Sequence, residues 1–223
     1  MKGALLLLIL IFFSLTGGCT IPSEGPNSVL GIPATIKTDE LQSGDITYTD
    51  DNERWPIYTN TYDRYKIYYP NTWIATPTDS PYREPETDRF GTISPIRKQV
   101  YIFPPMEEGR YLTTGNGMVL ITGYTISNPN SSYTTKQMND EFFQHFAGQM
   151  ESEKSVMNVK LDNNEYLING NPARHMTFEG DDGENTYEYF QIAHDYTFYT
   201  LQWAGNKSYV PTASKVMRTF ATY

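Results

Sequence analysis

The stretch that decides the fold is residues 173–203, which read ARHMTFEGDDGENTYEYFQIAHDYTFYTLQW. Apolar and polar side chains alternate through Ala173–Glu179, through Thr186–Ala193 and through Tyr196–Trp203. A period of two is typical of strands that bury one face. Turn residues at 181–183 and 194–195 separate these runs. The stretch therefore predicts consecutive antiparallel strands, with His175 opposite about Phe190.

Two helices are expected beside these strands. Thr134 or Thr135 is suited to the N-cap of a helix that runs to about Ser152. Its predicted apolar stripe consists of Met138, Phe142, Phe146, Gln149 and Met150. A second helix is predicted from Lys207 to Phe220. Its buried stripe consists of Val210, Ala213, Met217 and Phe220, while Lys215 and Arg218 face water.

The residues before these helices predict further strands. Tyr65–Tyr69 alternates and ends at Pro70, Val100–Phe103 is a short strand, and Met118–Ile126 is a mostly apolar, central one. The proline-rich residues 76–95 are expected to form a long surface loop. The order of elements predicts an α+β fold, an α/β/α sandwich with a central, mainly antiparallel sheet and a C-terminal helix. We expect one core, formed by Trp73, Phe142, Phe146, Trp203 and Phe220.

The N-terminus has the pattern of an export signal. Lys2 precedes the run Ala4–Leu15, which is apolar except for Ser14 and shorter than the about 20 residues of a membrane-spanning helix. Small residues at 16–18 then precede Cys19, the single cysteine of the chain. This arrangement resembles a prokaryotic lipobox, although Thr16 stands where a leucine is usual and Leu15 lies one place further back. The pattern predicts a lipoprotein signal peptide over 1–18 and lipidation of Cys19.

Two alternatives remain for this segment. Cys19 is either an ordinary thiol after a simple secretory signal, or the apolar run stays uncleaved as a short anchor. Residues 19–52 contain few large apolar side chains, several prolines and glycines, and an acidic end. They predict a flexible acidic tether between the lipid and a folded domain over 53–223.

The composition excludes several classes of function. The net charge of −9 disfavours nucleic-acid binding and direct adhesion to anionic lipid, both of which need a basic face. One cysteine cannot form a disulfide within the chain. A charged fraction of 19% with 39% hydrophobic residues indicates a folded domain rather than intrinsic disorder.

Three local motifs resemble those of the PsbP-like family. They are the aromatic strand and its Pro-x-x-Trp end at Tyr65–Trp73, the turn Asn169–Ala173, and the strand Tyr196–Trp203 followed by a terminal helix that ends at Val216–Phe220. The resemblance spans roughly Trp55 to Tyr223. It implies an α/β/α sandwich that docks on protein partners. It implies no enzyme activity.

A search for catalytic and metal-binding motifs finds little. The chain contains no nucleophile elbow, no phosphate-binding loop and no zinc-protease motif. His145, His175 and His194 fall on separate predicted elements, which does not favour a zinc site. Asp181, Asp182 and Glu184 are weak candidates for calcium ligands, and a solvated hairpin turn explains the same residues. No cofactor is expected.

The 18 tyrosines are the most unusual feature of the composition. Strand tyrosines such as Tyr187 and Tyr189 either present phenols on an exposed face or fill the core, and core filling is favoured. Asn130 and Asn206 begin N-glycosylation sequons, whose use the sequence leaves open.

The sequence therefore predicts a non-enzymatic lipoprotein that acts as an accessory or protein-binding module. We expect it at the cell membrane, anchored in lipid through Cys19, facing away from the cytoplasm, with a membrane or surface protein as its partner. The alternatives are a solute- or calcium-binding surface lipoprotein and a surface hydrolase with an unrecognised site. The absence of nucleophile and metal motifs counts against the hydrolase, and solute-binding lipoproteins are normally longer and two-lobed.

Overall fold

The middle of the fold is the predicted series of hairpins. A computed structural model describes residues 33–35, 45–46, 49–105, 117–153, 156–162, 164–180, 183 and 185–223. In it, β13 (Asn171–Gly180), β14 (Asn185–His194) and β15 (Thr197–Asn206) pair antiparallel in the order of the chain. His175 lies opposite Phe190, as predicted. The alternation of apolar residues therefore specified both the strands and their register.

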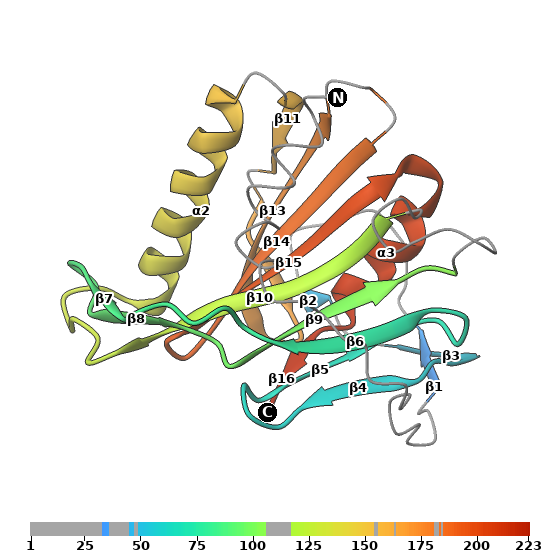
Figure 1. The fold of residues 1–223 in the computed structure, drawn as a ribbon, viewed down its shortest axis with the longest axis horizontal. Helices are drawn as coiled ribbons and strands as arrows, with labels where there is room; N and C mark the ends of the chain where they lie inside the picture. The colour runs from blue at the N-terminus through green and yellow to red at the C-terminus, as the bar shows by residue number, and fades with distance from the viewer. Residues whose placement is uncertain are drawn as a thin grey trace.

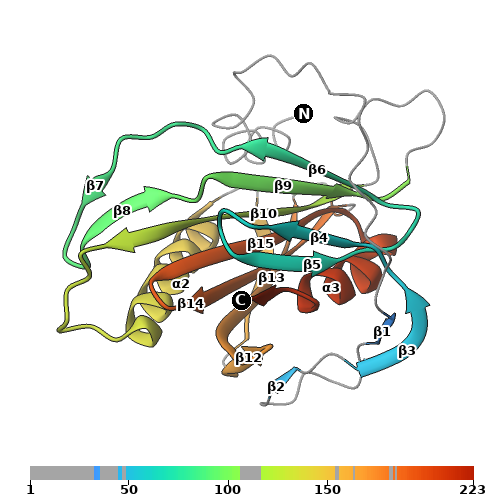
Figure 2. The ribbon, with the colours of Figure 1, turned by 90° about the horizontal axis from the view of Figure 1, so that it is seen from below.

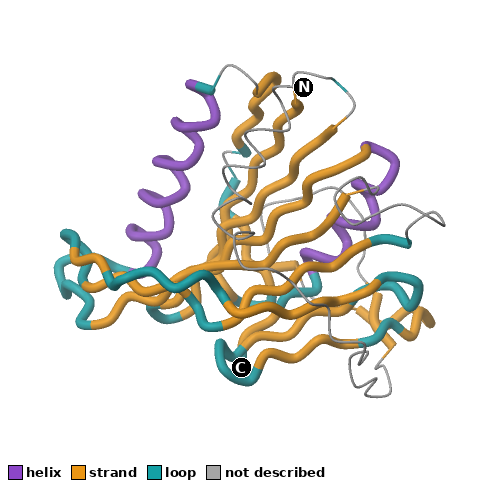
Figure 3. Tube along the Cα trace, in the orientation of Figure 1, coloured by secondary structure: helices purple, strands orange, loops and turns teal. Residues whose placement is uncertain are grey.

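The sheet extends on both sides of these hairpins (Figure 1). On one side, β13 pairs with β11 and β12. On the other, β15 pairs with β10, which pairs with β8 and β9, while β9 pairs with β6 and β8 with β7. The bounds are β6 (Ile74–Asp79), β7 (Glu86–Thr87), β8 (Thr92–Pro95), β9 (Lys98–Phe103), β10 (Gly117–Ser127), β11 (Val156–Leu161) and β12 (Tyr166–Ile168). All of these pairings are antiparallel, and strands make up most of the described chain (Figure 3).

The predicted surface loop over residues 76–95 is wrong at both ends. Its start belongs to β6 and its end to β8. Pro77 is compatible with a strand here because β6, among the described residues, pairs only with β9. A strand with neighbours on both sides donates its backbone N–H groups to both of them, and proline has no N–H group to donate. Proline is therefore tolerated in a strand that pairs along one edge.

The first helix, α2 (Thr135–Ser152), agrees with its predicted bounds. Thr134 is the N-cap, and its hydroxyl accepts the Gln137 backbone N–H while the Gln137 side chain accepts the Thr134 N–H. The predicted stripe is partly wrong: Gln149 is exposed, and Phe143 and Ala147 are buried instead. Met150 is buried in the cluster under α2, whereas Gln149, about 100° away around the helix, points to solvent.

The C-terminal helix is shorter than predicted. A 3₁₀ turn, η2 (Lys207–Tyr209), leads into α3 (Val210–Arg218). Ala213, Val216 and Met217 are buried against the sheet, and Ser214 is buried with them. The prediction that Arg218 faces water is wrong, because its side chain turns toward the sheet and its Nε atom is enclosed.

The two helices cover opposite faces of the sheet. Tyr189 packs under α2 against Phe146, whereas the next residue, Phe190, shares a core cluster with α3. Neighbouring residues of a strand point to opposite faces, so the two helices form outer layers. In Figure 1, α2 lies to the left of β13–β15 and α3 to their right. The structure is therefore α+β, with a mainly antiparallel sheet between two helices, one of them C-terminal, as predicted.

The expectation of a single core is wrong. Trp73, Trp203 and Phe220 share the cluster on the α3 face. Phe146 packs against a second cluster under α2, and Phe142 packs against a third that includes Phe90 and Phe198. The sheet separates the α3 cluster from the other two because side chains alternate to its two faces, and the α2 face itself holds two clusters.

A small second sheet joins the two ends of the domain. Its order is β16 (Ala221–Thr222), β5 (Tyr65–Tyr68) and β4 (Ile57–Asn60). Thr219, just after α3, accepts the Tyr68 backbone N–H at 2.8 Å. Tyr65 stacks on Phe220 with ring centroids 5.4 Å apart. These contacts hold the β4–β5 hairpin on the rest of the domain (Figure 2).

Short strands also occur within the segment predicted as a tether. β1 (Pro33–Thr35) pairs with β3 (Thr49–Arg54), and β2 (Asp45–Ile46) runs parallel to β12. The predicted bounds of signal peptide, tether and domain otherwise stay predictions. Among the described residues, no helix is long and apolar enough to cross a membrane.

Candidate functional site

A groove of about 360 Å³ lies where three connections meet: the β4–β5 turn, the segment after β6 and the β8–β9 connection. Figures 1 and 2 show these connections converging at one end of β6. The residues that line the groove are Tyr62, Asp79, Ser80, Pro81, Tyr82, Arg83, Pro95, Ile96, Arg97 and Lys98.

Hydrogen bonds of Asn60 and Asp63 hold together two of the connections that line the groove. Asn60 ends β4, and its Oδ1 atom accepts the backbone N–H groups of Tyr62 at 3.0 Å and Asp63 at 2.9 Å. Asparagine favours such turns because its side chain bonds to the backbone two residues on. Asp63 in turn accepts the backbone N–H groups of Arg97 at 2.8 Å and Lys98 at 2.9 Å. The Asp63 carboxylate thereby joins the β4–β5 turn to the β8–β9 connection.

Two further bonds complete this frame. The Tyr199 hydroxyl donates to the Asp63 carbonyl at 2.6 Å, which ties the turn to the central sheet. The Ser80 backbone N–H donates to the Arg97 carbonyl at 3.0 Å, which ties in the segment after β6. These bonds join the connections that line the groove, which lowers the conformational entropy that these connections lose when a ligand binds.

The rim of the groove is aromatic and cationic. Tyr62 is 65% exposed and Tyr82 is 86% exposed, the highest values among the large apolar and aromatic side chains of the described residues. The Arg97 guanidinium lies 6.0 Å from the centroid of the Tyr62 ring. Lys98 pairs with Asp79 at 2.5 Å. Exposed tyrosine and arginine are the residue types that protein-binding surfaces favour.

A second cluster of reactive side chains lies between the sheet and α3. Glu188 of β14 accepts a hydrogen bond from the Ser214 hydroxyl at 2.9 Å, and its Oε1 atom lies 3.0 Å from His175 Nε2. The other ring nitrogen of His175 lies 3.6 Å from Asp162. Tyr166 donates a hydrogen bond to Asp162. Serine, carboxylates, histidine and tyrosine are thus brought together from three strands, a loop and a helix.

The electrostatics of this buried cluster centre on Arg218. Burial lowers the pKa of its guanidinium, while the charge of Glu188 and the neighbouring Tyr166 act in the opposite direction. Burial and the bond to Asp162 raise the pKa of Tyr166 to about 12. Burial alone would raise the pKa of Asp162, but bonds from Tyr166 and Asn164 and the charge of His175 lower it overall.

The geometry of the buried cluster suits structure better than catalysis. The Ser214 hydroxyl donates to Glu188, not to His175, so the order of groups is not that of a Ser-His-Asp triad. Glu188 is 3% exposed and Ser214 is 8% exposed, which leaves a substrate almost no surface to contact. The cluster instead connects α3 to β13 and β14 by hydrogen bonds.

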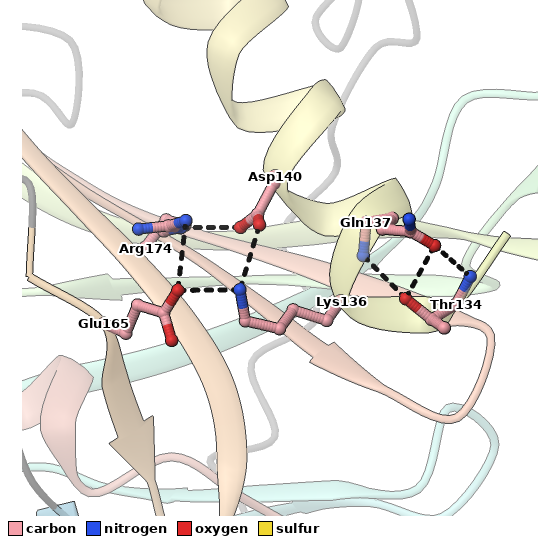
Figure 4. A network of polar contacts seen from close by, with 6 residues as sticks. All are labelled: Thr134, Lys136, Gln137, Asp140, Glu165 and Arg174. Atoms are coloured by element: carbon pink, nitrogen blue, oxygen red, sulfur yellow. Dashed lines mark hydrogen bonds and ion pairs between the residues drawn. The ribbon is translucent and has the colours of Figure 1, made fainter.

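A network of ion pairs performs a similar task on the other face (Figure 4). Arg174 of β13 pairs with Asp140 of α2 at 2.6 Å, and Lys136 bridges Asp140 at 3.3 Å and Glu165 at 2.7 Å. Burial alone would raise the pKa of Asp140, but Arg174 and Lys136 lower it overall. The network fixes the first turns of α2 beside β13.

The other residues singled out in the sequence divide into two groups. Cys19, Asp181, Asp182 and Glu184 lie outside the described residues, so lipidation and calcium binding stay predictions. Within the described part of the chain, no group of three histidine, cysteine, aspartate or glutamate side chains has a geometry that would hold a metal ion.

The three histidines are not brought together. His145 is exposed on α2 and contacts Gln149 at 3.1 Å, while His194 contacts Asn171 at 2.8 Å. Of the three, His175 is the one that lies in the buried cluster with Glu188.

Tyr189 confirms the favoured interpretation of the strand tyrosines as core residues, because its ring is buried with its centroid 4.4 Å from that of Phe146. The neighbouring Tyr187 is half-buried and stacks on Phe178. Both sequon asparagines are exposed. Asn130 donates its amide to the Arg89 carbonyl at 2.9 Å, and Asn206 caps η2 by accepting the Ser208 N–H at 2.9 Å.

Comparison with known proteins gives similarity of structure only. No family model and no curated protein matches the sequence. The fold is similar to the solution structure of the cyanobacterial PsbP protein, CyanoP, from Synechocystis sp. PCC 6803, with a TM-score of 0.43, 15% identity, and coverage of 75% of this chain and 91% of that one. It is also similar to a crystal structure from Bacteroides thetaiotaomicron, with a TM-score of 0.42, 12% identity, and coverage of 75% of this chain and 48% of that one.

Proposed function

We propose that this chain is a non-enzymatic, membrane-tethered lipoprotein that binds a membrane or surface protein, and that the groove between Tyr62 and Tyr82 is its contact surface. The observation that carries the proposal is a pair of highly exposed tyrosines. Tyr62 lies on the turn that Asn60 and Asp63 hold, and Tyr82 follows Ser80, whose N–H group bonds to the Arg97 carbonyl. Tyrosine contributes a large contact area at a low cost in side-chain entropy. A preformed aromatic rim is therefore suited to protein binding.

The hydrolase alternative lacks a comparable observation. Ser214 and Glu188, the pair that most nearly offers a nucleophile beside a base, are almost completely enclosed. Catalysis needs the nucleophile to reach its substrate. We therefore favour binding over catalysis for this chain.

The binding proposal is tested by recovery of a partner. We expect the chain, solubilised from its own membranes and purified, to bring one membrane or surface protein with it in constant stoichiometry. The double variant Tyr62→Ala, Tyr82→Ala should lose that protein. Tyr196→Ala is the matched control, because Tyr196 is also exposed but belongs to the β14–β15 turn and does not line the groove. Equal recovery by the double variant and the parent chain would refute the proposed contact surface.

The membrane attachment is tested separately. Cys19→Ser should move the chain from the membrane to a soluble fraction or block its processing, because the apolar run before Cys19 is short for a spanning helix. Normal cleavage with unchanged membrane attachment would contradict lipidation of Cys19.

A further inference from the structure

The groove differs in charge from the chain that carries it. The whole chain has a net charge of −9, yet the groove is lined by Arg83, Arg97 and Lys98 against the single carboxylate of Asp79. Lys98 already pairs with Asp79. The nearby Asp63 is occupied by backbone N–H groups. Arg97 is thus the cation through which the positive charge of the groove can act.

Arg97 is the group best placed to receive a ligand. Its side chain is exposed, lies over the Tyr62 ring, and forms no ion pair with any residue that the structure describes. The planar fork of N–H donors on an exposed arginine is accessible to a ligand. Such a fork matches the two oxygens of a carboxylate.

We infer, building on the proposed function, that the ligand of this groove is an acidic, aromatic-containing peptide segment of the partner protein. A carboxylate of the segment pairs with Arg97, and an adjacent apolar or aromatic side chain lies between Tyr62 and Tyr82. The cationic side chains of the groove favour an acidic ligand, because opposite charges attract. The two exposed tyrosine rings favour an aromatic side chain in that ligand.

The neighbouring strand favours a peptide over an acidic glycan. Within the described part of the chain, β6 pairs only with β9, so its other edge has backbone groups without a strand partner. The groove begins where β6 ends, at Asp79 and Ser80. An extended peptide satisfies such an edge with its own N–H and C=O groups, which a glycan cannot do in the same repeating pattern.

The test uses a fluorescent copolymer of glutamate and tyrosine, with binding to the full chain in detergent followed by anisotropy. We expect binding that weakens as salt is added. Arg97→Glu should weaken binding by about tenfold or more, because it replaces an attraction by a repulsion, with Arg97→Ala between it and the parent. Lys160→Glu on β11 is the control, since it makes the same change of charge at an exposed position outside the groove.

Each alternative outcome overturns the inference. Equal weakening by Arg97→Glu and Lys160→Glu would mean attraction to net charge only. Equal or tighter binding of polygalacturonate would assign the groove to an acidic glycan. Failure of the copolymer to bind would exclude the acidic peptide. The partner recovery described above is independent of these results, so a groove-dependent partner would retain the proposed function even then.

Discussion

Replacing Glu188 by alanine is expected to lower the free energy of unfolding by about 3–5 kcal/mol. The Glu188 carboxylate accepts the hydroxyl of Ser214 at 2.9 Å and lies 3.0 Å from His175 Nε2. Its charge also opposes the effect of burial on Arg218. Glu188→Ala removes all three interactions together and leaves a buried guanidinium without this neighbouring carboxylate. A cost of this size is typical when one partner of a buried charged pair is deleted.

Urea titration followed by tryptophan fluorescence measures this cost, because Trp73 and Trp203 are buried in the core cluster on the same face of the sheet. With a slope of about 1–3 kcal/mol per molar urea, the midpoint should fall by at least about 1 M. Ser214→Ala removes a single bond to the same carboxylate and should cost about 1–3 kcal/mol.

Glu151→Ala provides the control, since Glu151 is exposed at the end of α2 and its loss should stay within about 0.5 kcal/mol. The reasoning is refuted if the midpoint of Glu188→Ala differs from the parent by no more than that of Glu151→Ala. That result would mean that the buried cluster does not hold α3 on the sheet.

Three further predictions follow from packing and titration. Trp203→Ala should cost about 3–5 kcal/mol in the same urea assay, because the ring is completely buried, and an unmoved midpoint would contradict the strand facing. Burial and the Asp162 bond raise the pKa of Tyr166 from 10.0 to about 12, so its contribution to stability is complete below pH 10 and is lost as the pH rises toward 12. In Tyr166→Phe, the urea midpoint should fall less steeply between pH 10 and pH 12. The same fall as in the parent chain would mean that Tyr166 does not cause the decline. The pKa of Asp140 is lowered overall, mainly by Arg174, so its contribution is present above its usual value of 3.8 and is lost as the pH falls. Asp140→Asn should reduce the loss of stability between about pH 5 and pH 2, measured by thermal melting, and identical melting curves would contradict this.

The strands of the central sheet were predictable because their signal is local. In β14 and β15, most residues are buried on one face of the sheet or the other, and the alternation of side chains along each strand contains that information. The start of α2 was predictable for the same reason, because the cap at Thr134 depends on residues within one turn.

The groove could not be predicted, because it depends on residues far apart in the sequence. Asp63 meets Arg97 and Lys98 across more than thirty residues. The exposed Tyr82 follows β6. The prolines of residues 76–95 led to the prediction of a loop where β6 lies. The prolines show which residues lack an N–H donor. They do not show whether the strand pairs on one side or on both, which decides whether those donors are needed.

The buried cluster was missed although part of its signal was present in the sequence. The predicted register, with His175 opposite Phe190, places His175 and Glu188 on the same face of the sheet as the apolar Phe190, because residues two apart in a strand share a face. Polar side chains on a buried face require partners, since an unpaired buried charge is costly. Ser214 and Arg218 are four residues apart on α3 and therefore project from one side of the helix. The charge of Arg218 suggested that this residue faces water, but a helix packed on the face of Glu188 brings the Ser214 hydroxyl to that carboxylate and the Arg218 guanidinium close enough to feel its charge. His175 and Glu188 therefore indicate which side of α3 faces the sheet. The apolar stripe of the helix alone did not provide this information.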